Sequence, residues 1–205
     1  MMHTLIAGVT GSGKSYTEHL LIKELVGSKI YIDPKRVELR KYKNNTDCVR
    51  YAADIEDCVE ALRDACDEME NRYLTMEFGD ATEYTGLPLY VIVDEAAALM
   101  DSGGGSKKEA TQLLYNLAFL GRAAKVYLIL CTQRCTADVI PRKISVNLEN
   151  KICLRQQKPV DSRELIGIPD ASRLPKIGWC YLLTPDMRRP ERMTPEMAVE
   201  RVKEA

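Results

Sequence analysis

The stretch GVTGSGKS, at residues 8–15, constrains this chain more than any other part of its sequence. It fits the pattern G-x-x-x-x-G-K-[ST], with Gly8, Gly13, Lys14 and Ser15 at the defining positions. Glycines let successive backbone N–H groups turn inward around an anion, where bulkier residues would clash. The pattern therefore predicts a loop that binds the phosphates of a nucleoside triphosphate. Its expected nucleotide contacts are Gly8, Thr10, Gly11, Ser12, Gly13, Lys14, Ser15 and Tyr16.

The residues around this loop favour the same interpretation. The apolar run TLIA, at residues 4–7, suits a buried strand, and residues 16–26 carry apolar side chains at a mostly helical spacing. A helix that starts at the loop adds the partial positive charge of its N-terminus to the anion site. The alternative is a chance Gly-Ser turn, which the four matched positions between a strand and a helix make improbable.

Strand-like and helical segments alternate along the rest of the chain. The runs LYVIV (89–93) and VYLILC (126–131) are apolar throughout, as in a parallel sheet that is buried on both faces. We therefore predict an α/β fold with a mostly parallel central sheet flanked by helices, in one domain over residues 1–205. Further strands are expected at 29–32, 49–52, 151–154 and, as the last, 179–183; helices are expected at 54–78 and 109–121, after a DSGGGSKK loop.

Composition excludes several classes of protein. No apolar run approaches the roughly 18 residues of a membrane-spanning helix, and the N-terminus lacks the basic region of a signal peptide. The seven cysteines are odd in number and form no C-x-x-C pair, which fits neither a zinc site nor a disulfide framework. We expect a cytoplasmic protein with reduced thiols, and Cys58, Cys66, Cys131 and Cys153 as small buried side chains.

Two segments supply candidates for the rest of the site. Asp94 and Glu95 follow an apolar strand, where an acid can hold Mg²⁺ and its neighbour can activate water for attack on the terminal phosphate. Gln133 ends the next buried strand, and ligands collect at that edge of a parallel sheet. An ordinary strand-end turn and a solvated glutamine are the alternatives.

An arginine often stabilises the charge that develops during phosphoryl transfer, in many cases from a neighbouring subunit. Arg122 is the first candidate, and Arg134 and Arg155 are the reserves. Each of them can instead be a surface or ion-paired arginine. An arginine that acts between subunits requires an oligomer.

The net charge of −1 does not indicate a nucleic-acid binder, but the charges are unevenly distributed. Residues 120–158 hold eight basic and two acidic side chains, whereas residues 54–70 hold eight acidic side chains and one basic. This separation suits a basic surface for a polyanion, and it equally suits two ordinary solvated faces.

The segments GVTGSGKS, YIDPKRVEL, ALRDACDEMENRY, VIVDEAAALM, GRAAKVYLILCTQR and PVDSREL together resemble the motor domain of the FtsK and SpoIIIE family of DNA translocases, within the larger HerA and FtsK group. The resemblance runs in the same order over residues 3–185. It implies a RecA-like P-loop fold, ATP and Mg²⁺ as cofactors, and a hexameric ring that passes double-stranded DNA through its pore.

The resemblance also implies roles for single residues. Lys14 and Ser15 would hold phosphate and Mg²⁺, and Asp94 and Glu95 would be the metal-binding and catalytic acids. Gln133 would sense the terminal phosphate, and Arg122 would act across subunits. Residues 138–147 resemble the pore-facing segment of the family, where Arg142 and Lys143 would contact DNA phosphates; Lys107 and Lys108 are weaker candidates.

The chain departs from the family at several points. It has Cys135 where the family has proline, and Ala96 and Ala98 where phenylalanine and aspartate are usual. We expect it to lack the family's membrane-spanning part, the extra domain before the motor and the DNA-reading module, and we expect residues from about 186 to 205 to form a C-terminal extension. A short motor of this kind would suit phage or virus packaging, or plasmid or transposon transfer. Two other functions stay open: a small-molecule or nucleotide kinase with residues 186–192 as a lid, and a nucleotide-gated module of a larger motor.

Overall fold

The computed structural model describes residues 2–204, which divide into two compact units. The described part of the first unit is residues 2–25 and 130–204, and the second unit is Val26–Ile129. Each unit is a piece of sheet with its own helices. The single domain over residues 1–205 stays a prediction.

The second unit is built on three parallel strands in the order β3-β2-β4. These are β2 (Ser28–Ile32), β3 (Cys48–Ala52) and β4 (Leu89–Val93), and every residue of β4 is buried. The pairing aligns Ile32 with Val93, so the residues after β2 and β4 leave the sheet at the same edge. Strand β5 (Val126–Thr132) begins in this unit. The strands predicted at 29–32, 49–52, 89–93 and 126–131 are therefore confirmed.

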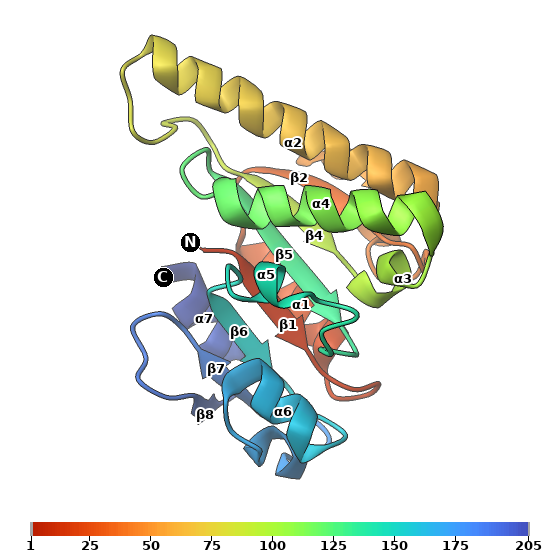
Figure 1. The fold of residues 1–205 in the computed structure, drawn as a ribbon. Coiled ribbons are helices and arrows are strands. Elements are labelled where there is room, and N and C mark those ends of the chain that lie inside the picture. Colours follow the sequence, from red (N-terminus) through yellow and green to blue (C-terminus); the bar gives the residue numbers. More distant parts are fainter. Residues whose placement is uncertain (1, 205) are drawn as a thin grey trace. The chain divides into compact units, whose positions relative to one another are not determined.

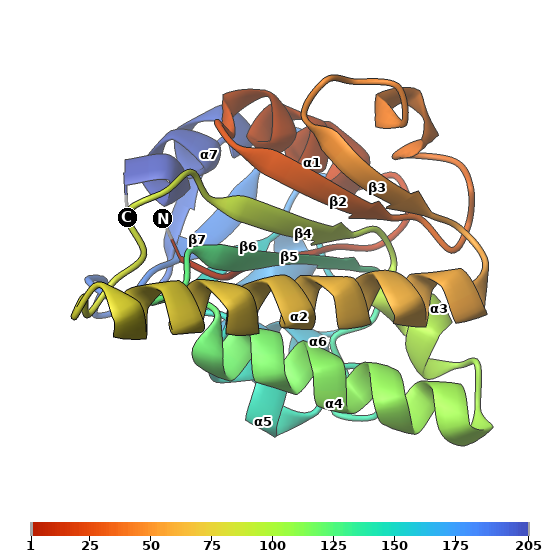
Figure 2. The same cartoon turned by 90° about the horizontal axis from the view of Figure 1, so that it is seen from above.

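Two helices of this unit, α2 (Ile55–Phe78) and α4 (Gly104–Leu120), pack against each other on one side of its strands (Figures 1 and 2). Helix α2 begins after Asp54, at the predicted place, and it buries a stripe at three- and four-residue steps that includes Cys58, Leu62 and Met69. The unit also has the short helix α3 (Ala96–Met100) and the 3₁₀ turn η1 (Arg40–Tyr42).

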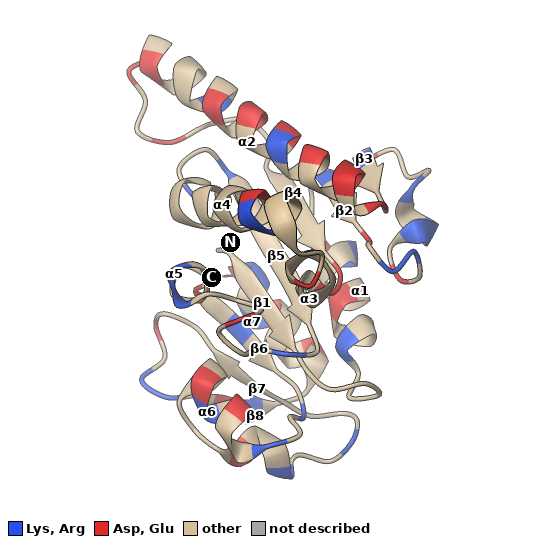
Figure 3. Cartoon of the chain, turned by 45° about the vertical axis from the view of Figure 1, so that its right-hand side comes forward, with Lys and Arg blue, Asp and Glu red and all other residues tan. Residues whose placement is uncertain are grey.

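Several acidic side chains of α2 pair with arginines within the same unit. Arg50 of β3 pairs with Asp57, Glu60 and Asp64. Figure 3 shows the acidic residues of α2 as red turns along the helix. Two more pairs join Arg63 to Glu109 and Arg72 to Glu68. The acidic stretch is thus a helix face with its counter-ions, which favours the ordinary interpretation of that half of the charge pattern.

The first unit contains strands β1 (Thr4–Ala7), β6 (Asn150–Cys153), β7 (Cys180–Leu183) and β8 (Glu191–Met193), in the order β1-β6-β7-β8. Strands β1 and β6 are parallel, whereas β7 and β8 are antiparallel to their neighbours. Helices α1 (Lys14–Glu24) and α7 (Pro195–Glu204) pack together on one face, and α5 (Arg142–Ser145) and α6 (Pro159–Ile166) lie on the other (Figure 2). The 3₁₀ turn η2 (Asp170–Arg173) follows α6.

Three sequence-based expectations were wrong. Helix α4 begins at Gly104, so Lys107 and Lys108 lie on a helix and not in a glycine-rich loop; the positive φ of 76° at Gly103 sets the start. Strand β7 is not the last, because the chain turns back into β8 after residues 184–190. The first helix begins at Lys14 rather than residue 16.

The described cysteines behave as predicted. All seven are free thiols, and Cys58, Cys66, Cys131 and Cys153 are buried. Burial raises the pKa of the Cys58, Cys66 and Cys153 thiols to about 12, so these side chains stay protonated and act as small apolar groups.

Candidate nucleotide-binding site

The phosphate loop of the first unit joins β1 directly to α1. Gly11 and Gly13 have positive φ angles of 75° and 97°, a conformation that L side chains rarely adopt. Gly13 is the residue before the first turn of α1, and Lys14 begins the helix with only 8% of its surface exposed. The backbone N–H groups of the first turn have no partner within the helix, which is the arrangement that binds anions.

The loop residues fit a bound phosphate group. A methyl group at Gly8 would lie 2.4 Å from the Ser12 Oγ and 2.8 Å from the Leu154 Cβ, so only glycine fits there. The Ser12 hydroxyl is buried, and the described residues offer it no hydrogen-bond partner. A buried polar group without a partner is costly, and a phosphate oxygen would satisfy it.

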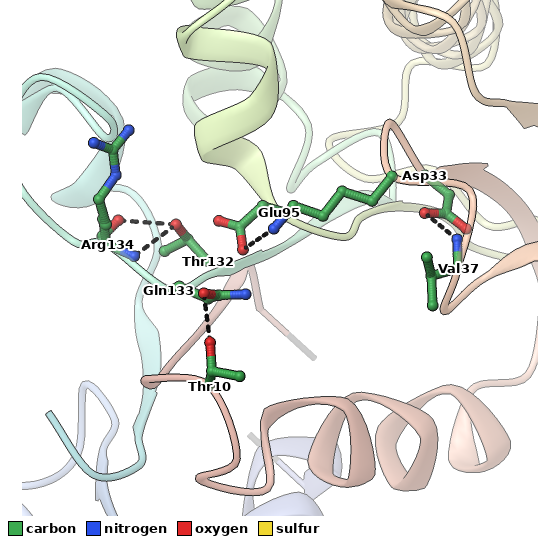
Figure 4. A network of polar contacts seen from close by, with 8 residues as sticks. Thr10, Asp33, Val37, Glu95, Thr132, Gln133 and Arg134 are labelled. Carbon is green, nitrogen blue, oxygen red and sulfur yellow. Dashed lines mark hydrogen bonds and ion pairs between the residues drawn. The ribbon is translucent and has the colours of Figure 1, made fainter.

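Gln133, the residue after β5, contacts the phosphate loop, and its predicted role at the terminal phosphate stays a prediction. The Thr10 hydroxyl donates a hydrogen bond of 2.9 Å to the Gln133 Oε1 (Figure 4). Backbone bonds hold the loop between two strand ends: the Gly8 N–H donates to the Thr132 carbonyl at 3.2 Å, and the Val9 N–H donates to the Arg155 carbonyl at 3.0 Å. The side chain of Gln133 is thereby fixed beside the loop.

A pocket of about 580 Å³ opens beside this loop in the first unit. It contains both reserve arginines, Arg134 and Arg155, and a third cation, Lys176, which the sequence analysis did not select. A methyl group on Gly11 would lie 3.1 Å from the Lys176 Cε, so this lysine lies over the loop. Nothing in the sequence around Lys176 marks it as a site residue. The pocket is lined by Val9, Thr10, Gln133, Arg134, Arg155, Gln156, Gln157 and Lys176.

Tyr16 lies on the exposed surface of α1, where it contacts α7. Its hydroxyl donates a hydrogen bond of 2.7 Å to the Glu196 Oε1. This bond raises the pKa of Tyr16 above its ordinary value and lowers the pKa of Glu196. Part of the C-terminal segment, at Glu196, is therefore packed on the helix that begins at Lys14.

The acid pair of the second unit follows β4. The Asp94 N–H donates to the Ile32 carbonyl at 3.0 Å, and Asp94 and Glu95 are each 3% exposed. Glu95 has a φ of 63°, an unusual left-handed conformation for a residue with a side chain, and such conformations gather at functional sites. Its carboxylate forms an ion pair of 3.0 Å with Lys35, which the sequence analysis did not predict.

The remaining predicted residues lie on exposed segments. Arg122 is in the turn after α4 in the second unit, and its carbonyl accepts a hydrogen bond from the Lys125 N–H. Arg142 and Lys143 are exposed on α5 in the first unit, beside the buried Ile144. The roles predicted for these three residues stay predictions.

Residues 186–192, the expected lid of a kinase, belong largely to the β7–β8 hairpin. The Arg192 guanidinium lies 4.4 Å from the centre of the Trp179 ring, and Asp186 pairs with Arg201 at 3.5 Å. These contacts bind the segment to its own unit, which argues against a lid.

None of the helices within residues 2–204 has both the length and the apolar character that a membrane span requires. No group of three or more histidine, cysteine, aspartate or glutamate side chains gathers there into a metal site. Mg²⁺ is commonly held by one or two carboxylates and the phosphates of its nucleotide, which needs no such group.

The chain is similar to proteins of known class. Residues 1–86 match the FtsK/SpoIIIE family. The chain is 33% identical to the DNA translocase FtsK of Chlorobaculum tepidum over 220 residues, covering 94% of the chain and 27% of that protein. It is 34% identical to FtsK of Borreliella burgdorferi over 195 residues, covering 84% of the chain and 24% of that protein. The chain thus spans about a quarter of the length of these relatives.

A solved structure shows the same fold. The pCW3 conjugation coupling protein TcpA, in its monomer form with ATPγS, superposes with a TM-score of 0.81 at 21% identity, over 98% of this chain and 65% of TcpA. The predicted fold class, a mostly parallel sheet flanked by helices, is therefore confirmed. Together with the phosphate loop and the acid pair, these matches show that the chain belongs to the FtsK/SpoIIIE family.

Proposed function

We propose that this protein is an ATPase that drives double-stranded DNA along its surface as a homo-oligomeric, hexameric ring. The observation that carries the proposal is the hydrogen bond between Thr10 of the phosphate loop and Gln133. A glutamine attached to the loop can respond to the presence of the terminal phosphate. Such a response suits a motor better than a kinase, because hydrolysis in a motor must change the conformation of the protein.

Within this proposal each group of the site has one task. Lys14 and the loop N–H groups bind the phosphates, and Ser15 and Asp94 hold Mg²⁺. When bound there, Mg²⁺ would supply charge neutralisation at the phosphates. Glu95 takes a proton from the attacking water, and Arg122 stabilises the developing charge from a neighbouring subunit.

The proposed DNA contacts come from α5. Arg142 and Lys143 are neighbouring exposed cations on a segment held by a buried isoleucine, which suits phosphate contacts that do not depend on base sequence. Lys107 and Lys108 on α4 are weaker candidates for the same contacts. The relatives are named DNA translocases, which supports DNA as the partner. A cytoplasmic location stays a prediction.

The test is the rate of ATP hydrolysis with and without long duplex DNA, at two salt concentrations. We expect DNA to raise the rate, and this stimulation to weaken at higher salt because phosphate contacts release counter-ions. Replacing Arg142 and Lys143 by alanine should reduce the steepness with which log affinity for duplex DNA falls against log salt concentration by about two. The rate of ATP hydrolysis without DNA should stay unchanged.

The matched control replaces Arg188 and Arg189, an exposed pair in the β7–β8 hairpin, and should keep the wild-type slope. Phosphate transferred to a small acceptor, with no effect of DNA, would support the kinase instead. Slow hydrolysis that DNA leaves unchanged would support a nucleotide-gated module.

A further inference from the structure

Glu95 and Lys35 leave the same edge of the sheet in the second unit. Glu95 follows β4 and Lys35 follows β2, and these strands are parallel neighbours with Ile32 opposite Val93. The Asp94 N–H continues the pairing by donating to the Ile32 carbonyl at 3.0 Å. The segment with the lysine and the segment with the acid are therefore held side by side by backbone hydrogen bonds.

The ion pair itself joins a buried group to a half-exposed one. The Lys35 Nζ lies 3.0 Å from the Glu95 Oε2, as the dashed line from Glu95 in Figure 4 marks, and the side chains are 45% and 4% exposed respectively. A carboxylate removed from water loses its hydration, and an ammonium group in contact replaces part of it. Lys35 therefore replaces part of the water that this buried carboxylate has lost and fixes the direction of one of its oxygens.

Asp33 organises the loop that carries Lys35. Its carboxylate is completely buried and accepts hydrogen bonds from the N–H groups of Val37, at 3.2 Å, and Leu39, at 3.0 Å. The Tyr51 hydroxyl also donates to it, at 3.4 Å. A buried acid that accepts hydrogen bonds from two N–H groups of one loop holds that loop in one conformation.

Arg36, the residue after Lys35, is fixed as well. It has a positive φ of 58°, its N–H donates to the Asp33 carbonyl at 2.9 Å, and its guanidinium pairs with Asp54. The backbone is thus held in one conformation on both sides of Lys35. This conformation places the ammonium group of Lys35 against the Glu95 carboxylate.

We propose that Lys35 is a positioning residue for Glu95: it holds the carboxylate in the orientation in which it accepts a proton from the attacking water. The inference rests on the proposed function, in which Glu95 is the general base. A base held in one orientation needs no reorganisation when the reaction begins, which is the source of the expected rate advantage.

The test compares Lys35→Met and Lys35→Arg with wild type by steady-state ATP hydrolysis in the presence of duplex DNA. We expect Lys35→Met to lower kcat by about tenfold or more, because losing the partner of a catalytic group has effects of this size. The KM for ATP should stay within about twofold, since the transition state and not substrate binding is affected. Lys35→Arg keeps the charge and should restore part of kcat.

The control is Lys41→Met. Lys41 lies in the same connection between β2 and β3, and its ammonium group lies 5.2 Å from the centre of the Tyr42 ring. The variant therefore removes one positive charge from the same connection without removing a partner of Glu95. It should keep the wild-type kcat.

A double-mutant cycle with Glu95→Gln separates positioning from a general structural effect. If Lys35 acts through Glu95, adding Lys35→Met to Glu95→Gln should change the residual single-turnover rate by less than about twofold. Thermal unfolding of the same four proteins gives a readout without activity: Lys35→Met should lower Tm less in the Glu95→Gln background than in wild type.

Each other outcome has a distinct meaning. An unchanged kcat in Lys35→Met, with an active wild type, overturns the positioning role alone. A raised DNA-independent rate also overturns it, because the ion pair would then restrain Glu95 rather than prepare it. A wild type that hydrolyses no ATP, with or without DNA, overturns the proposed function itself.

Discussion

Glu95→Gln is expected to leave ATP binding intact and to lower kcat for hydrolysis by about 10²- to 10⁴-fold, the range that a general base contributes. The amide has nearly the shape of the carboxylate, but it cannot accept the proton of the attacking water. ATP should therefore stay bound and uncleaved on the variant. Filter binding of labelled ATP, together with the rate of phosphate release, measures both effects.

The matched control is Asp101→Asn, an acid-to-amide change at an exposed residue that ends α3, the helix that starts after Glu95. It should keep the wild-type rate. Normal phosphate release by Glu95→Gln would remove Glu95 from its role as the base, and the site would then need another one.

Arg122→Ala should produce the second large effect, a loss of about 10³- to 10⁵-fold in kcat, if Arg122 acts as an arginine finger. Because a finger from one subunit serves the active site of its neighbour, variant subunits should also inhibit wild-type subunits in mixed rings. The measurement is ATPase activity at constant total protein while the fraction of variant is increased. We expect activity to fall faster than the wild-type fraction.

Arg40→Ala, which removes an exposed arginine of η1, serves as the control and should leave the ATPase activity unchanged at every fraction of variant. The same titration with Arg134→Ala and Arg155→Ala tests the two arginines that line the pocket beside the phosphate loop. A proportional loss with Arg122→Ala and a steeper loss with either of these would transfer the role to that arginine.

The regular part of the fold could be predicted from the sequence because its signals are local. The run LYVIV is apolar throughout and forms the fully buried β4, and the stripe from Cys58 to Met76 forms the buried face of α2. The phosphate loop is defined by glycines whose positive φ angles and close contacts the pattern already requires. Local sequence is enough wherever one segment determines its own shape.

The parts that were missed depend on contacts between distant segments. Glycine has a low helix propensity, so Gly104 and Gly105 predicted a loop, yet they form the first turn of α4 after the positive φ of Gly103. Strand β8 has three residues and becomes a strand only by pairing with β7. Lys35 is far from Glu95 in the sequence, and only the register of β2 with β4 places them in contact.

The central claim is that hydrolysis of ATP moves this protein along a double helix. The most direct measurement is the displacement of a labelled third strand from a DNA triplex, at the end of a long duplex, by the purified protein. We predict displacement with ATP by wild type, and none with a non-hydrolysable ATP analogue or with Glu95→Gln. Displacement that proceeds equally without hydrolysis, or an intact triplex despite rapid DNA-stimulated hydrolysis by wild type, would contradict the claim.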